Sequence, residues 1–472
     1  MGLVEEEYRD KIATVDAGGK RIWVYPKKPQ GPFYKWRSWV SYALLLLLFA
    51  GPFLRINGQP ALMLNVLERK FVILGQVFWP QDFYLFALAL ITLVVFIILF
   101  TVVYGRLFCG WVCPQTIFME MLFRKIEYAI EGDYTAQKKL DRQAWNREKI
   151  VKKGSKHIIF FALSFLIANT FFAYIIGSDA LLEIIADPPG EHLGGLGAIL
   201  VFTFVFYYVF ARFREQVCTT VCPYGRLQGV LLDRKSTVVS YDYKRGEPKA
   251  KLRKTEDRSQ TLKGDCIECK QCVVVCPTGI DIRNGTQLEC INCTACIDAC
   301  NAIMDRVGLP QDLIRYASEE DIAEGKGHKG FRMDTRSIAY TAVLFILLGV
   351  LGGLLFFRSN LNATVLRQPG MLYQRQDDGT ISNLYQYKFI NKTQDSLTVH
   401  LKLLELPEGK IEIVGSENKL NLAGQQIAEG ALFIKLPPEA LSETSQELTI
   451  GIFNADEKLI KSLNTKFLGP VK

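Results

Sequence analysis

The chain reads Cys266-Ile-Glu-Cys269-Lys-Gln-Cys272-Val-Val-Val-Cys276-Pro277 and, 24 residues further on, Cys290-Ile-Asn-Cys293-Thr-Ala-Cys296-Ile-Asp-Ala-Cys300. Both stretches follow the spacing C-x2-C-x2-C-x3-C. This repeated spacing is typical of a bacterial-type ferredoxin, in which two cysteine loops each surround a cubane [4Fe–4S] cluster. We therefore expect a 2[4Fe–4S] ferredoxin domain of the α+β class at 233–337, inserted between apolar segments.

The fourth cysteine of each stretch is expected to bind the cluster of the other stretch. Cluster I then takes Cys266, Cys269, Cys272 and Cys300, and cluster II takes Cys290, Cys293, Cys296 and Cys276. Asn301 stands where a proline is usual, which weakens the signal for a helix start but removes no ligand. Two zinc sites are the alternative, and the repeated spacing favours the cubanes.

The remaining four of the twelve cysteines form two C-x3-C-P pairs, Cys109/Cys113 and Cys218/Cys222, each just after a long apolar run. Four residues apart on a helix, two thiols share one face. Thiolates favour Cu(I), zinc and iron–sulfur centres. Reversible disulfides and small buried side chains that pack helices are the other interpretations. If the two preceding helix pairs are a duplication, the four thiols meet at one membrane edge.

Five segments have the length and apolar character of membrane spans, at about 36–54, 83–104, 157–176, 193–211 and 338–357. The first four make a membrane region at 36–232 that carries both C-x3-C-P pairs, after an N-terminal segment at 1–35. We thus expect a multi-domain integral membrane protein with a five-helix transmembrane bundle.

The loop charges predict the orientation of the spans. The 105–156 loop carries eleven Lys and Arg, whereas the 177–192 loop carries none. Because cytoplasmic loops are enriched in these residues, the N-terminus and the ferredoxin domain are expected in the cytoplasm, and residues 358–472 outside. No signal peptide is evident in the first 37 residues. The net charge of +8 is spread over loops, so we expect no nucleic-acid partner.

The C-terminal part alternates apolar and polar residues, as in Leu384–Ile390 and Leu397–Leu403, which predicts a small β-sandwich at 358–472. It has no cysteine and one histidine, His400, which favours an interaction module over a redox centre. His157 and His192 lie at opposite ends of the predicted spans and cannot ligate one haem. Asp187, Glu191 and His192 offer an outer metal site, although a solvated loop is favoured.

This arrangement of spans, C-x3-C-P pairs, ferredoxin insert and external sandwich resembles the family of the cytochrome c oxidase accessory protein CcoG, also called FixG or RdxA. The resemblance covers almost the whole chain. It implies an immunoglobulin-like C-terminal domain, a bacterial cytoplasmic-membrane location, and reduction of Cu(II) to Cu(I) during assembly of a cbb3-type cytochrome c oxidase. Oxidase subunits or copper chaperones are then expected partners.

On this resemblance the chain is a cupric reductase. A soluble cytosolic donor, not identified by the sequence, reduces the two [4Fe–4S] clusters, which pass electrons to copper held near Cys109, Cys113, Cys218 and Cys222. One alternative is a membrane ferredoxin that carries electrons between a quinol and a periplasmic reductase. Another is a non-redox assembly scaffold whose clusters are structural.

Overall fold

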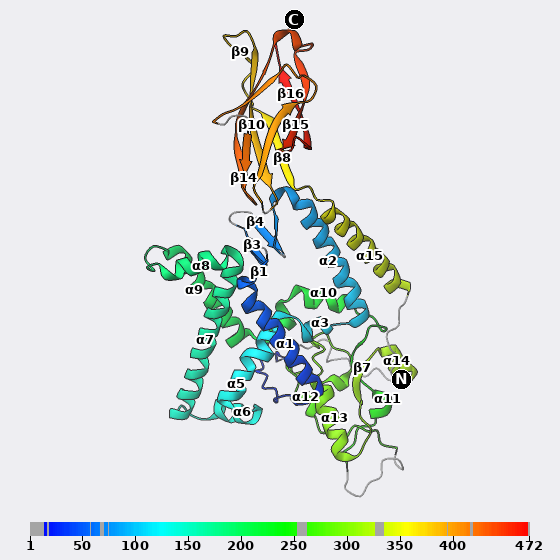
Figure 1. Cartoon of the computed structure of the whole chain (residues 1–472). Coiled ribbons are helices and arrows are strands. Elements are labelled where there is room, and N and C mark those ends of the chain that lie inside the picture. Colours follow the sequence, from blue (N-terminus) through cyan, green and yellow to red (C-terminus); the bar gives the residue numbers. More distant parts are fainter. Residues whose placement is uncertain are drawn as a thin grey trace. The chain divides into compact units, whose positions relative to one another are not determined.

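The computed structural model describes residues 14–16, 18–56, 58–66, 70–73, 75–252, 262–325, 335–393, 395–415 and 419–470. The expected N-terminal segment and ferredoxin domain therefore lie partly outside the described residues, at 1–13, 253–261 and 326–334. The chain forms two compact units, Met1–Gln76 with Asp82–Leu351, and Val77–Gln81 with Gly352–Lys472 (Figure 1). Each unit is considered by itself.

Four helices in the described ranges are long and apolar enough to cross a membrane. They are α2 (Phe83–Tyr104), α7 (Arg147–Ile176), α9 (Leu193–Tyr208) with its π-helical continuation to Phe213, and α15 (Thr335–Phe356). The bounds of α2 match the predicted span. Helix α7 begins ten residues before its predicted span because the lysine-rich segment before His157 is also helical.

The predicted first span forms a helix, α1 (Pro32–Ala50), followed by a short 3-10 turn at Gly51–Phe53. It is not among the four membrane-length apolar helices, since Lys35 and Arg37 lie in its first two turns. Pro32 at the first helical position is favourable, because a proline lacks the N–H that would otherwise be unpaired there.

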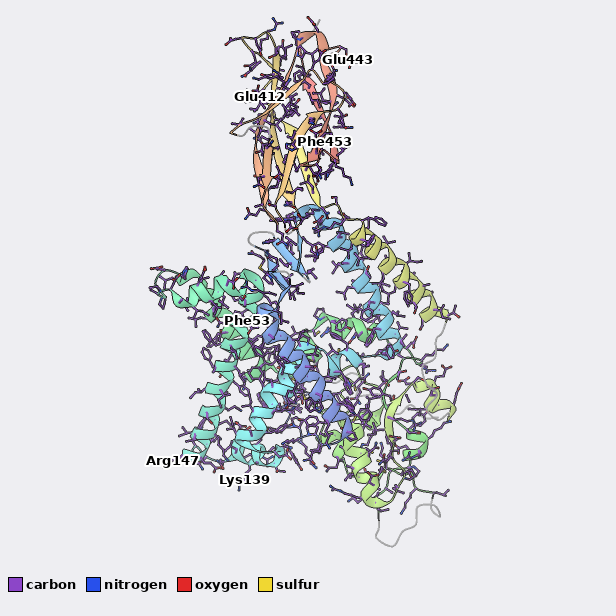
Figure 2. The ribbon with its side chains drawn as sticks, in the orientation of Figure 1. Phe53, Lys139, Arg147, Glu412, Glu443 and Phe453 are labelled. Atoms are coloured by element: carbon purple, nitrogen blue, oxygen red, sulfur yellow. The ribbon has the colours of Figure 1, made fainter. Side chains whose placement is uncertain are left out.

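Helix α1 runs in the same direction as α7. Near its beginning, the backbone N–H of Tyr34 donates to Asp298 of the ferredoxin insert (2.8 Å). Near its end, the hydroxyl of Tyr174, close to the end of α7, donates to the carbonyl of Leu48 (2.9 Å). Phe53, just beyond α1, lies well away from Arg147, the first residue of α7 (Figure 2).

Between α1 and α2 the chain forms a hairpin, β3 (Leu62–Asn65) and β4 (Lys70–Ile73), which packs against α7 and which no sequence pattern predicted.

The helices of the second and the fourth predicted spans end with the same backbone conformation. Gly105 follows α2 with φ 58 and ψ −132, and Arg214 follows the α9 continuation with φ 51 and ψ −121. Each of these residues lies four positions before the first cysteine of a C-x3-C-P pair. A positive φ is natural for glycine and unusual for arginine. The shared geometry supports the predicted duplication.

Each C-x3-C-P pair then leads into a helix that begins at its proline. After Cys113 the chain forms α4 (Pro114–Thr116), a π-helical turn at Ile117–Phe123 and α5 (Arg124–Glu131). After Cys222 it forms α10 (Pro223–Leu231). The connecting helices are α6 (Tyr134–Arg142) and α8 (Ser178–Ala186).

The insert has the predicted α+β class. Strands β6 (Val238–Tyr241) and β7 (Ile314–Ala317) pair antiparallel, and α12 (Gln271–Val274) contacts α13 (Ala295–Val307). The described part of the insert also has three short elements, α11 (Tyr243–Gly246), a 3-10 turn at Ile282–Asn284 and α14 (Glu319–Glu324).

The second unit is the predicted β-sandwich. One sheet has the order β12-β14-β10-β8, with β9 beside β10, and the other has the order β13-β11-β15-β16. The strands are β8 (Leu361–Arg367), β9 (Gln374–Arg375), β10 (Ile381–Asn391), β11 (Leu397–Leu403), β12 (Lys410–Ile413), β13 (Lys419–Leu422), β14 (Ile427–Leu436), β15 (Ser445–Asn454) and β16 (Leu459–Leu468). Alternate residues such as Phe389, Ile434 and Ile450 fill the space between the sheets.

The insert lies directly against α3 (Leu107–Trp111), the short helix that carries Cys109. A Cβ atom on Gly110 would come within 2.6 Å of the carbonyl oxygen of Ile291 and 2.7 Å of that of Asn292. Both are backbone atoms of the second cysteine loop. Glycine is therefore the residue that permits this approach.

We expect Gly110→Ala to destabilise the first unit by about 1–3 kcal/mol, because the loop backbone must move away. The measurement is the thermal unfolding midpoint of the full chain in detergent, with bound iron determined in parallel. Gly154→Ala is the matched control, since nothing lies within 4 Å of its added Cβ in α7. It is expected to be neutral or stabilising by about 0.5–1 kcal/mol. Equal midpoints for the two variants would contradict the close contact.

Candidate metal centres at the clustered cysteines

Two small cavities in the insert divide its eight cysteines. Cys266, Cys269, Cys272 and Cys300 line one of them, together with apolar side chains such as Met304. The cysteines that line the other are Cys276, Cys290, Cys293 and Cys296, with Cys272 at the boundary between the two. The structure thus brings Cys300 to the first three cysteines of the first stretch, and Cys276 to the first three of the second.

The two cysteine loops share an unusual backbone. Glu268 and Lys270 have positive φ values of 57 and 55, and Asn292 and Thr294, at the same positions of the second loop, have 53 and 64. A left-handed conformation costs a residue with a side chain about 1–2 kcal/mol. Its repetition at equivalent positions fits a loop that folds around a bound group, since such backbone strain gathers at ligand sites.

Burial raises the pKa of the insert thiols. The pKa of Cys272, Cys290 and Cys300 rises to about 12, and that of Cys293 to about 11. Burial outweighs the nearby arginines, so these thiols keep their protons at neutral pH as long as no metal is bound. Binding of iron replaces those protons, because metals bind the thiolate.

The two C-x3-C-P pairs do not lie on one continuous helical face, contrary to the expectation from their spacing. Cys109 is in α3, whereas Cys113 is extended with ψ 125 and immediately precedes α4. Cys222 has the same conformation, with ψ 110. The reason is the following proline, which disfavours the helical conformation of the residue before it. Both extended cysteines donate a backbone hydrogen bond five residues back, to Phe108 (2.9 Å) and to Val217 (2.7 Å).

The four thiols of these pairs nevertheless lie near one another. Burial, with a smaller contribution from the neighbouring thiols, raises the pKa of Cys109 and of Cys218 to about 12. For Cys218 these neighbours are Cys113, Cys109 and Cys222. The structure therefore brings together the two pairs, which are about 100 residues apart in the sequence. We refer to Cys109, Cys113, Cys218 and Cys222 as the four-thiol site.

One neighbour of the four-thiol site has no signal in the sequence. The thiol of Cys109 donates to the side-chain carbonyl of Gln228 in α10 (2.9 Å), and the amide of Gln228 donates to the hydroxyl of Thr101 (3.3 Å). Gln228 is fully buried. A glutamine in a helix has no motif that marks it, so its place beside a thiol follows only from the packing of α10 on α2.

The four-thiol site shares a wall with the second cavity of the insert. Cys109 and Cys293 belong to one buried apolar cluster with Val275, Ile291 and Ala295. Cys218, Tyr224 and Cys296 pack against the same cluster. Thiols from the membrane region and from the ferredoxin insert therefore lie in one apolar cluster.

Two buried arginines, which no sequence motif marks, form hydrogen bonds with the backbone on both sides of this cluster. From α1, Arg37 donates to the carbonyl of Gly110 (2.7 Å) and to that of Cys293 (3.2 Å). Arg106, before α3, donates to the carbonyl of Cys290 (3.2 Å) and also to those of Leu288 and Gly225. Each guanidinium thus joins the segment around Cys109 to the second cysteine loop. Their charge lowers the pKa of Cys293 and Cys290, against the larger effect of burial.

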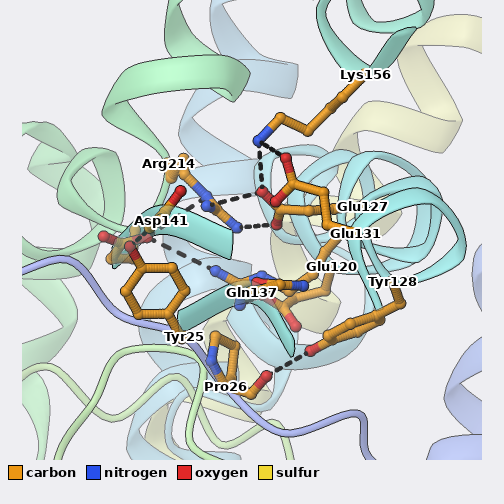
Figure 3. A network of polar contacts seen from close by, with 12 residues as sticks. Tyr25, Pro26, Glu120, Glu127, Tyr128, Glu131, Gln137, Asp141, Lys156 and Arg214 are labelled. Carbon is orange, nitrogen blue, oxygen red and sulfur yellow. Dashed lines mark hydrogen bonds and ion pairs between the residues drawn. The ribbon is translucent and has the colours of Figure 1, made fainter. Parts of the chain in front are cut away.

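A buried network of ion pairs anchors the segment that leads into Cys218 (Figure 3). Arg214 pairs with Glu127 of α5 (2.7 Å), and Lys156 of α7 pairs with Glu131 (2.7 Å). Burial alone would raise the pKa of Glu127, but Arg214 and Lys156 hold it at about 2. Glu127 therefore stays ionised, and the network fixes the end of α9 against α5 and α7.

A separate group lies on the 177–192 loop. The ligand atoms of Asp187, Glu191 and His192 lie within 4.8 Å of one another, and the His192 ring is 3.0 Å from the Asp187 carboxylate. The two carboxylates are exposed. Among the described residues no three thiols meet the same distance condition. The group fits the solvated loop that the sequence analysis favoured.

Comparisons with known proteins match every part of this architecture. Residues 213–319 match the model of a 4Fe-4S dicluster domain, and residues 86–130 that of a 4Fe-4S binding domain. Residues 351–470 match the model described as an IG-like fold at the C-terminal of FixG. The first two matches contain all twelve cysteines.

The chain is 30% identical to the nitrogen fixation protein FixG of Rhizobium meliloti, over 91% of this chain and 90% of that protein. It is 36% identical to the protein RdxA of Cereibacter sphaeroides, over 78% of this chain and 79% of that protein. A solved structure of a FixG-related protein from Vibrio parahaemolyticus covers 24% of this chain and 99% of its own, at 17% identity and a TM-score of 0.21. This chain therefore belongs to the FixG/RdxA family, which is also the family of CcoG, and is a membrane-associated iron–sulfur electron-transfer protein.

Proposed function

We propose that the insert holds two [4Fe–4S] clusters with exchanged fourth ligands. Cluster I is bound by Cys266, Cys269, Cys272 and Cys300, and cluster II by Cys290, Cys293, Cys296 and Cys276. The two four-cysteine cavities support this assignment, because each contains one set. The clusters supply one-electron carriers that lie close together, since Cys272 lines both cavities.

We further propose that the four-thiol site binds copper and that the chain reduces Cu(II) to Cu(I) there. The observation that supports this most directly is the shared wall between Cys109 and Cys293. An electron that leaves cluster II can therefore reach the four-thiol site through this apolar cluster. One Cu(II) takes up one electron and becomes Cu(I), which matches a one-electron donor.

The residues of the site favour the reduced metal. Thiolates are soft ligands that prefer Cu(I), so their coordination stabilises the product of the reduction. Cys109 is buried, which limits the access of water, and water hydrates Cu(II) more strongly than Cu(I). Copper binding also removes the thiol protons, because these thiols are protonated when the site is empty.

The family membership supports a role in assembly of a cbb3-type cytochrome c oxidase. Copper ions are then the substrate, oxidase subunits or copper chaperones the recipients, and a cytosolic protein the electron donor. The immunoglobulin-like unit, which has no cysteine, is the part proposed to contact these recipients. The four-thiol site is proposed as the place where the activity resides.

For the membrane topology we propose five spans, with α1 as the first. Its beginning contacts α13 of the insert and its end contacts α7 near Tyr174, so α1 extends along the same depth as a membrane-length helix. With five spans the N-terminus and the insert share the cytoplasmic side, and the immunoglobulin-like unit lies in the periplasm. The segments are 1–35, 36–232, 233–337, 338–357 and 358–472.

Paired substitutions test the exchanged ligands. Wild-type protein purified without oxygen is expected to contain about eight irons. Cys266→Ser with Cys300→Ser removes two ligands of one cluster and should leave about four irons. Cys266→Ser with Cys276→Ser affects both clusters and should leave almost none. The opposite pattern would contradict the exchange, and stoichiometric zinc would contradict the clusters. Asn301→Ala, next to Cys300, is the control that should retain all the iron.

Copper reduction is tested with serine at all four positions of the four-thiol site. Anaerobically reduced protein receives Cu(II), and Cu(I) is measured with a chromogenic chelator. The four-serine variant should keep about eight irons and lose most of the rate, to near the protein-free background. Thr219→Ala with Thr220→Ala, between Cys218 and Cys222, is the matched control and should react like wild type. An unchanged rate in the four-serine variant would exclude this site.

Reporter fusions at the two termini test the number of spans. With five spans, a fluorescent protein at the N-terminus should mature in the cytoplasm and alkaline phosphatase at the C-terminus should be active outside. With α1 outside the membrane, both termini would lie on one side. A fusion in the lysine-rich loop after Gly132 provides the cytoplasmic reference.

A further inference from the structure

Another cavity of the first unit, with no cysteine in its lining, lies between the first part of α7 and the end of α9. It has a volume of ≈ 490 Å³ and is open to solvent. Its walls are aromatic, with Trp23 and Tyr25 from the N-terminal segment and Tyr207 and Tyr208 from α9. The charged groups in it include Arg212. Neither the electron transfer nor the proposed copper chemistry uses this cavity.

The charges behind the cavity form a balanced network. Nine ion pairs connect five cations with five carboxylates. The cations are Arg21, Arg124, Lys153, Lys156 and Arg214, and the carboxylates are Glu120, Glu127, Glu131, Asp141 and Glu215. Figure 3 shows part of this network. Lys153, Lys156 and Asp141, which reach the cavity, are thus already neutralised.

Arg212 adds a positive charge that this network does not balance. Three guanidinium groups surround the ring of Trp23, those of Arg21 (4.3 Å from the ring centroid), Arg214 (5.0 Å) and Arg212 (5.9 Å). Arg21 pairs with Glu215 and Arg214 with Glu127. Within the described residues, no carboxylate oxygen lies within 4.0 Å of the Arg212 guanidinium. The Arg212 guanidinium in this cavity is therefore available to bind an anion.

The cavity also lies at the boundary between the polar and the apolar parts of α7 and α9, which is the depth expected for a lipid headgroup. Its α7 residues, such as His157, stand where the charged first part of α7 ends, and its α9 residues stand where that apolar helix ends. His157 and Tyr207 join the two helices through a hydrogen bond of 2.9 Å. Just beyond, Ile158 is 71% exposed and Phe204 is 62% exposed. Such a sequence of aromatic, polar and then apolar side chains is typical of a membrane interface.

We propose that this cavity binds the phosphate of an acidic membrane phospholipid, with Arg212 as its main cationic partner. The Tyr208 side chain of the wall is suited to contact the rest of the headgroup, and the exposed apolar side chains of α7 and α9 are suited to contact the acyl chains. Basic pockets between membrane helices on the cytoplasmic side commonly recognise such headgroups. The bound phosphate neutralises the positive charge of Arg212, which the network of ion pairs does not balance.

This site connects to the electron-transfer part of the molecule through the backbone. Arg212 is two residues before Arg214, whose positive φ marks the start of the segment that carries Cys218. A lipid that holds Arg212 therefore steadies the end of α9 at the point where the chain turns toward the four-thiol site. The proposal does not depend on copper and can fail independently of it.

The test uses the full chain, delipidated in detergent, and native mass spectrometry. The probes are dioleoylphosphatidylglycerol, dioleoylphosphatidylcholine and inorganic phosphate. Wild type should bind the phosphatidylglycerol at least about fivefold more tightly than the phosphatidylcholine, since one basic residue at a membrane surface contributes about this factor. Arg212→Gln should abolish this preference, and Arg212→Lys should retain much of it.

The matched control is Lys152→Gln. Lys152 is also on the lysine-rich turn of α7, but it pairs with Glu148 and does not line the cavity. This variant should bind as wild type does. Equal binding of the two lipids to wild type, or an unchanged preference in Arg212→Gln, would overturn the proposal. Displacement of the bound lipid by inorganic phosphate at equal concentration would instead assign the site to free phosphate. Thermal midpoints and iron content identify any variant that fails to fold.

Discussion

The contact between the segment around Cys109 and the second cysteine loop is the constraint on which the first unit depends. The absence of a side chain at Gly110 lets the two backbones meet, and Arg37 and Arg106 join them through hydrogen bonds to carbonyl oxygens. These guanidinium groups are almost fully buried. Hydrogen bonds from a charged donor are stronger than neutral ones, and leaving such a charge without them in the interior would cost several kcal/mol. The insert and the membrane helices are therefore one compact unit.

The two similar helix ends determine where the thiols lie relative to this contact. Gly105 and Arg214 each end a long apolar helix with a positive φ, and the following turns bring one cysteine of each pair, Cys109 and Cys218, to the same apolar cluster. For Arg214 the conformation is unfavourable by about 1–2 kcal/mol. Its ion pair with Glu127 offsets this, since removing one partner of a buried pair costs about 3–5 kcal/mol. The ionic network is thus part of what positions Cys218 and Cys222.

The sequence predicted the helices and strands more accurately than the segments that connect them. The run Phe83–Tyr104 is uniformly apolar, so its helix was predicted with both ends correct. The alternation in the C-terminal part identified its strands, because a period of two is specific for a half-buried sheet. The helical pairing of Cys109 with Cys113 was wrong, since the proline after each pair extends the preceding residue. The hairpin between α1 and α2 has no clear pattern and was missed.

By itself the sequence determined the number and spacing of the thiols, the apolar helices and the sandwich, because these depend on local spacing and on the period of apolar residues. Only the tertiary structure decided that Cys109 and Cys293 lie in one apolar cluster and that Gln228, Arg37 and Arg106 lie beside them. Such neighbours come from residues about 70 to 260 positions apart. Their chemistry depends on how helices pack in three dimensions, and no local pattern in the chain records it.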